Sequence, residues 1–143
     1  MKEMTIVIDG TAVERFNSHY KKTHPRSRKD AIASPLHPSL NSWAIMRRGE
    51  ANALKQKYKE FIVWLCEESG VANAGIERCE VTVRYYFNRR ARHDSDNYTP
   101  KFFLDGLTEA NVIADDDFAH IREMHIVGGY DKENPRTEII ITY

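Results

Sequence analysis

Two aspartates separated by a single residue, Asp94 and Asp96, have the types and spacing expected of metal ligands. A run of three more aspartates, Asp115–Asp117, follows them along the chain. Magnesium prefers oxygen ligands and is usually held by one or two carboxylates together with water and substrate phosphate. A carboxylate pair from one segment and a third from another can hold one metal, or two about 4 Å apart, at a scissile phosphate. The pattern therefore predicts a site for Mg²⁺, or for Mn²⁺ as a substitute, that acts on a phosphate ester.

Basic side chains flank this acidic pattern. Arg89, Arg90 and Arg92, together with His93, directly precede the aspartate pair, and Lys101 follows it. The three arginines are expected to hold the phosphates on either side of a scissile bond. Lys101 can reach a phosphate, or stabilise a leaving oxygen as a compact point charge.

Each of these features also has an ordinary structural explanation. Aspartates are common in turns and helix caps, and a run of three is often a solvated loop, so Asp115 and Asp117 receive no assigned role. Lys101 and Asp105 are spaced i, i+4 and can form a simple surface pair on a helix. His120 is assigned to a strand without a special function. The combination favours a site: arginines, an Asp-x-Asp-Asn motif, a lysine on a helix, and aspartates again.

A strand is expected to position the aspartate pair. Residues 79–87 alternate, with Val81, Val83 and Tyr85 directed to one side, which is typical of a strand with one buried face. The strand ends just before the arginines and leads into the aspartates. Carboxylates at i and i+2 of an extended chain point to the same side, so we expect Asp94 and Asp96 to lie together.

A helix of about three turns is expected to bring in the remaining aspartates. Asn97 or Thr99 can cap it, and Pro100 is acceptable in a first helical turn. Asn111 can adopt the left-handed conformation that ends a helix. The chain would then turn back and deliver Asp115–Asp117 just before the next strand.

The other elements complete the expected fold. A strand is predicted at 4–9, an amphipathic helix at 50–69, and a hairpin of two strands at 118–128 and 137–143. Together they predict a single α+β domain over residues 1–143, with an about four-stranded mixed β-sheet and two main helices packed on it.

Residues 11–40 show no sustained periodicity and are expected to form a long loop. Six basic residues lie between Arg15 and Lys29, with no acidic residue among them. A loop of this length is usually either functional or disordered. Two interpretations stay open: a solvated, mobile arm, or an arm that contacts phosphates and becomes ordered on its substrate. The second interpretation assigns DNA contacts to Lys21, Lys22, Arg26 and Arg28.

The net charge of zero conceals an uneven distribution. Residues 1–93 carry 17 Lys and Arg against 10 Asp and Glu, whereas residues 94–133 carry 3 against 10. This asymmetry suits a protein that binds a polyanion with one surface and cations with another. No membrane span or signal peptide is evident, and Cys66 and Cys79 are expected to be reduced core thiols, so a cytoplasmic location is predicted.

The central stretch resembles the RusA family of Holliday junction resolvases, which are crossover junction endodeoxyribonucleases. The resemblance covers about residues 89–118: Arg90 to Asn97, then Lys101, the Leu-Asp-Gly-Leu sequence at 104–107, and Asp115-Asp116. The interval from Asp96 to Lys101 is one residue longer than in the family pattern. The resemblance implies a RusA-like, homodimeric fold and a metal site formed by Asp94, Asp96 and Asp116, with Lys101 as a catalytic lysine.

The expected function is therefore magnesium-dependent cleavage of branched DNA in recombination and repair. The resemblance implies paired symmetric nicks in four-way junctions, and two such nicks require two sites related by a two-fold axis, hence a homodimer. Two alternatives remain open: a related nuclease acting on flaps or forks, and a non-catalytic DNA-binding module with a solvated or calcium-binding acidic cluster.

Overall fold

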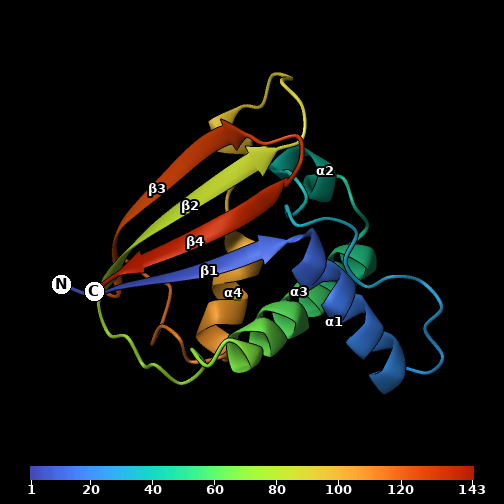
Figure 1. Cartoon of the computed structure of the whole chain (residues 1–143), viewed down its shortest axis with the longest axis horizontal. Coiled ribbons are helices and arrows are strands. Elements are labelled where there is room, and N and C mark those ends of the chain that lie inside the picture. Colours follow the sequence, from blue (N-terminus) through green and yellow to red (C-terminus); the bar gives the residue numbers. More distant parts are fainter.

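The computed structural model describes all residues 1–143 and shows a four-stranded sheet with its helices gathered on one side (Figure 1). The expected α+β class with a mixed four-stranded sheet is confirmed. The strands are β1 (Glu3–Asp9), β2 (Cys79–Phe87), β3 (Ile121–Tyr130) and β4 (Arg136–Thr142). The helices are α1 (Gly10–Thr23), α2 (Leu40–Ala44), α3 (Arg48–Glu68) and α4 (Lys101–Glu109), with a 3-10 turn η1 (Ser95–Asn97).

The strand order is β1-β4-β2-β3, so the predicted hairpin of the last two strands is wrong. β4 pairs antiparallel with β1 and with β2, whereas β3 pairs parallel with β2 at the edge of the sheet. Two strand spacings separate β3 from β4, about 10 Å. The five residues 131–135 can span more than that distance, roughly 15 Å when extended, so a short connection does not force the strands to pair.

The core lies between the sheet and the helices. Strand side chains alternate in burial, as in Val81, Val83 and Tyr85 of β2, which are fully buried. α3 contributes Phe61 and Ile62 to the same cluster of buried residues. Because β2 has partners on both sides and one packed face, it is the central support of the loop that follows it.

Both cysteines are free and buried, as the sequence predicted. Burial raises the pKa of the Cys66 thiol to about 12, so it stays protonated and unreactive. None of the helices combines the length and apolar character needed to traverse a lipid bilayer.

The first half of the predicted basic loop is in fact helix α1. The Asp9 carboxylate accepts a hydrogen bond from the N–H of Ala12 at 2.9 Å and so caps it. One face of the helix buries Val13, Phe16 and Asn17. Asn17 bonds the backbone of Ile32 in both directions, donating to its C=O at 2.9 Å and accepting from its N–H at 3.0 Å. The helix is thus held to the segment that follows it.

The irregular segment 24–39 is bound to the sheet rather than solvated throughout. Thr137 on β4 donates its hydroxyl to the C=O of Pro35 at 2.8 Å. His37 is buried, and its Nδ1–H donates to the C=O of Pro38 at 2.8 Å. Nε2 therefore accepts from the Tyr85 hydroxyl at 2.5 Å. These contacts hold the segment against β2 and β4.

Helix α4 ends where the sequence predicted. Asn111 has a φ of 52°, the left-handed conformation expected at this helix end. Pro100 occupies the N-cap position, and neither Asn97 nor Thr99 caps the helix with its side chain. α4 packs closely on α3, because Gly106 lies directly against the side chain of Ile62.

Candidate functional site

The aspartate pair lies on the turn η1, just after the loop that leaves β2. Asp94 caps the turn, and Asp96 lies within it, so the predicted extended geometry is wrong. Both side chains are exposed. Asn97 accepts a hydrogen bond from the backbone N–H of Asn41 at 2.9 Å, which ties η1 to α2. The exposed carboxylates are therefore presented on a turn that is fixed at its base.

Lys101, Asp105 and Asp116 form a second group beside helix α4. Lys101 is the first helical residue, and its Nζ lies 3.7 Å from a carboxylate oxygen of Asp105 one turn later. The charge of Asp105 also acts on Asp116. Partial burial, the charge of Asp105 and the adjacent Asp115 carboxylate all raise the pKa of Asp116. Negative charge is thus concentrated here beyond what Lys101 neutralises, and a bound cation would relieve it.

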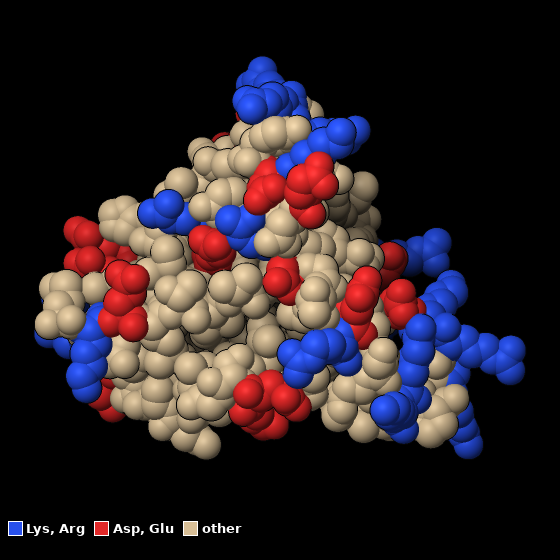
Figure 2. Space-filling model, in the orientation of Figure 1, with Lys and Arg blue, Asp and Glu red and all other residues tan.

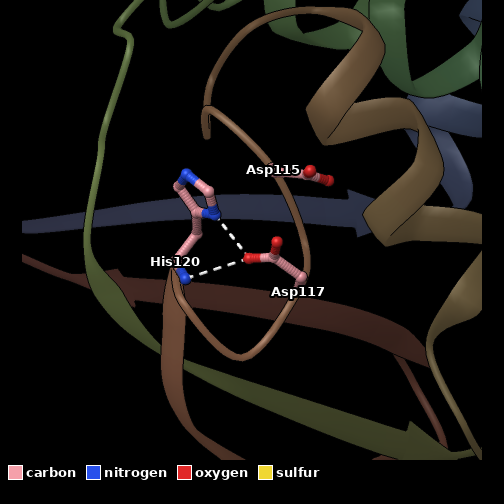
Figure 3. A group of neighbouring side chains, drawn as sticks. All are labelled: Asp115, Asp117 and His120. Carbon is pink, nitrogen blue, oxygen red and sulfur yellow. Dashed lines mark hydrogen bonds and ion pairs between the residues drawn. The ribbon is translucent and has the colours of Figure 1, made fainter.

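A third group joins Asp115, Asp117 and His120 in the loop before β3. One potential ligand atom from each lies within 4.8 Å of the others. Figure 3 shows that the ring and backbone N–H of His120 both bond the Asp117 carboxylate. This pairing lowers the pKa of Asp117 and raises the pKa of His120. Two carboxylates and an imidazole could hold a divalent ion; the imidazole suits a transition metal better than Mg²⁺.

The structure does not bring Asp94, Asp96 and Asp116 into a group of metal-ligand spacing. Only Asp115, Asp117 and His120 place three potential ligand atoms within 4.8 Å of one another. η1 does lie against β3, the strand that the aspartate run precedes. η1 meets the later part of β3, near Ile126 and Gly128, whereas the aspartate run precedes the opposite end of that strand, so the predicted ligands are not clustered.

The predicted DNA-binding residues gather at two places on the surface. Figure 2 shows one basic group over the loop after β2, at the top, and another over the loop after α1, at the right. In the first, Arg92 donates to Asp94 at 3.0 Å, and the guanidinium of Arg90 lies 4.3 Å from the centre of the Tyr130 ring. In the second, Lys21 pairs with Asp30 at 2.7 Å. The remaining predicted contacts, Arg89, Lys22, Arg26 and Arg28, are exposed and make no ion pair.

Two residues have a larger part than the sequence suggested. Asp105 was interpreted as a surface partner of Lys101, yet its charge also raises the pKa of Asp116; its i, i+4 spacing from the lysine was the available signal. His120 was assigned to a strand without a function, yet it lies before β3 and bonds Asp117. The three-residue spacing between Asp117 and His120 carries no sequence signal, because it depends on how the loop turns.

No family model matches this chain, and no curated protein matches it significantly. Function is therefore inferred from the residues of the site and their geometry.

Proposed function

We propose that this protein is a metal-dependent, structure-selective endodeoxyribonuclease of the RusA type. It would resolve four-way DNA junctions by paired symmetric nicks, as a homodimer, in recombination and repair. The observation that carries the proposal is the acidic group of Asp105, Asp115 and Asp116, where partial burial and the neighbouring carboxylates raise the pKa of Asp116 and Lys101 pairs with Asp105 alone. A group of this kind fits a hard divalent cation, because its free donors are carboxylate oxygens.

Each residue of the site has a defined role in the proposed reaction. Asp94, Asp96 and Asp116 would hold Mg²⁺, or Mn²⁺ in its place. When bound there, such a metal would polarise the scissile phosphate and lower the pKa of a coordinated water. Lys101 would place its ammonium near the leaving oxygen and offset the charge that develops there. Asp105 would orient Lys101 through their ion pair.

The basic loop before η1 supports a nucleic-acid substrate. Arg89, Arg90 and Arg92 are exposed beside the aspartates, and guanidinium groups suit phosphate because of their paired donors. Arg92 donates a hydrogen bond to Asp94. Its guanidinium could exchange this carboxylate for a DNA phosphate when the metal and DNA bind.

Substitution of single carboxylates tests the proposal. Asp94→Asn, Asp96→Asn and Asp116→Asn should each reduce magnesium-dependent nicking of a four-way junction by at least about 100-fold, while junction binding in Ca²⁺ is retained. Asp115→Asn and Asp117→Asn are the matched controls and should keep most activity. Full activity in Asp116→Asn would exclude the assignment. Loss of activity in the Asp115 and Asp117 variants would move the metal to the cluster with His120.

Alternative substrates and a non-catalytic role are separated by the same assay. Comparing a four-way junction with a flap, a fork and a plain duplex distinguishes the junction resolvase from a related nuclease. A non-catalytic DNA-binding module is the second candidate, because the three predicted ligands are not clustered. Junction binding without nicking of any substrate in Mg²⁺ or Mn²⁺ would support it.

A further inference from the structure

A cavity of about 150 Å³ opens directly beside the candidate metal site. It lies between the ends of β2 and β3 and the turn η1, and Asp94 and Ser95 form part of its wall. The residues proposed for the reaction leave this space unused. A cavity of this volume is large enough for one benzene-sized ring, as an engineered cavity of about the same volume shows in another protein.

The wall of the cavity toward β2 is aromatic. Phe87 and His93 stack with ring centres 3.7 Å apart and planes 10° from parallel. Tyr98 meets Phe87 edge-on at 5.2 Å, and Tyr85 lies 5.3 Å from Tyr98. Rings that enclose a space of this size offer flat faces to a planar ligand.

β3 forms the opposite wall, and one of the residues there is a glycine, which adds no side chain to the wall. Gly128 lines the cavity and pairs with Tyr85 across the parallel strands. A Cβ placed on Gly128 would meet no atom within 4 Å. The space is therefore open above this position.

The surroundings of the cavity fit a polyanion that carries flat rings. The exposed Arg89 and Arg90 belong to the loop that leads to His93, and the carboxylate-bearing Asp94 lines the cavity. A strand whose phosphate is held at η1 would have its neighbouring bases within reach of the aromatic wall. Proteins bind unstacked bases in this way, between aromatic side chains and beside a basic track.

We propose that this cavity binds one unstacked nucleobase of the DNA strand, next to the phosphate that a divalent cation at Asp94 would hold. The inference rests on the proposed function and deepens it, because a base pocket at the site would make cutting depend on the nucleotide beside the scissile bond. The Ser95 hydroxyl at the rim can donate to or accept from the edge of that base.

Filling the cavity from Gly128 tests the proposal without altering any carboxylate or arginine. Gly128→Leu adds a side chain at the cavity wall, where a Cβ would meet no atom within 4 Å. His125→Leu is the matched control, since His125 lies on the same strand, is exposed and does not line the cavity. Binding is measured in Ca²⁺ to four-way junctions in which each nucleotide near the branch is replaced, one at a time, by an abasic site.

Wild-type protein should bind roughly tenfold more weakly when one particular base is missing. Gly128→Leu should bind the intact junction with that same weakened affinity and should be insensitive to the abasic site. His125→Leu should behave as wild type. The proposal is overturned if no single abasic position weakens binding, if Gly128→Leu keeps the full sensitivity, or if sedimentation shows that Gly128→Leu changes the oligomeric state, which would place the cavity in a protein interface.

Nicking of the same junctions in Mg²⁺ separates this inference from the proposed function. Cutting without dependence on any single base would keep the nuclease and remove the base pocket. Base-dependent binding without cutting would keep the pocket and remove the nuclease. Absence of binding to every one of these DNAs would overturn both.

Discussion

The Asp116 side chain is in an environment that disfavours its charged form. Partial burial and the neighbouring carboxylates of Asp105 and Asp115 raise its pKa. A carboxyl whose pKa is higher in the folded than in the unfolded protein lowers the stability of the fold as the pH rises from the unfolded pKa to the folded pKa, and the full loss remains at higher pH. Groups whose pKa values are perturbed by burial and by specific charged neighbours are found more often at functional sites.

Replacing Asp116 by asparagine should therefore stabilise the metal-free protein. At pH 7 negative charge on the wild-type side chain is opposed by partial burial and by the neighbouring carboxylates, so Asp116→Asn should raise the Tm by about 1–3 °C. At pH 3, below the ordinary value of 3.8, the carboxyl is protonated in both states and the gain should disappear. Thermal unfolding with EDTA at both pH values measures this. A lower Tm for Asp116→Asn at pH 7 would contradict the interpretation of its environment.

For single residues, the sequence predicted which residue types contribute to the candidate site, but it did not predict which of them contact one another. Asp94 and Asp96 were selected by spacing and Asp116 by resemblance, and the structure places Asp116 before the end of β3 that lies away from η1. The pairing of Asp117 with His120 depends on the turn of the loop between α4 and β3. Local sequence does not determine that turn, so the cluster could not be predicted.

Among the elements, β2 and α3 were predicted almost to the residue, whereas α1 was missed. The β2 and α3 segments have clear periods of two and 3.6 in apolar side chains. In α1 the buried face includes the polar Asn17, whose amide is satisfied by the backbone of Ile32. A polar residue on the inward face breaks the apolar pattern, and only the tertiary contact explains its burial.

The contact of α4 with α3 yields a prediction at the scale of elements. A Cβ on Gly106 would lie 2.4 Å from Cβ of Ile62, so Gly106→Ala must push the helices apart. Overpacking of this kind destabilises by about 1–3 kcal/mol, against a gain of up to about 1 kcal/mol from helix propensity. The net loss is measured by urea unfolding.

Gly49→Ala is the control for this substitution. Gly49 also lies in a helix, α3, but a Cβ there meets no atom within 4 Å. The variant should be neutral or slightly more stable. If Gly106→Ala is as stable as Gly49→Ala, the close contact between α3 and α4 is not tight in solution. Displacement of α4 should also lower nicking, because Lys101 and Asp105 move with the helix.

For the whole molecule, the class of fold could be predicted but the strand order could not. Sequential strands often pair, which favoured a hairpin of β3 and β4. The burial pattern argues otherwise: β2 is buried along alternate residues, whereas β3 is largely exposed, as suits an edge strand. The order β4-β2-β3 places the central strand between two partners, and it is this order that sets η1 against β3.

The two basic groups on the surface predict how binding depends on salt. Each phosphate neutralised by a protein cation contributes about −0.9 to the slope of log K against log[salt] on duplex DNA. Replacing Arg89, Arg90 and Arg92 together by glutamine should reduce the magnitude of the slope by roughly 2–3. Lys2→Gln is the control, because the N-terminal end lies away from both basic loops in Figure 1.

The second basic group should behave differently at Lys21 than at its neighbours. Lys21 is paired with Asp30, so Lys21→Gln should change the slope little. The exposed Lys22, Arg26 and Arg28 make no ion pair, and their combined replacement by glutamine should reduce the slope by roughly 2–3 if the loop contacts the same DNA. A slope unchanged in that triple variant would identify the loop after α1 as a solvated arm. Unchanged slopes in both triple variants would exclude phosphate binding at either group.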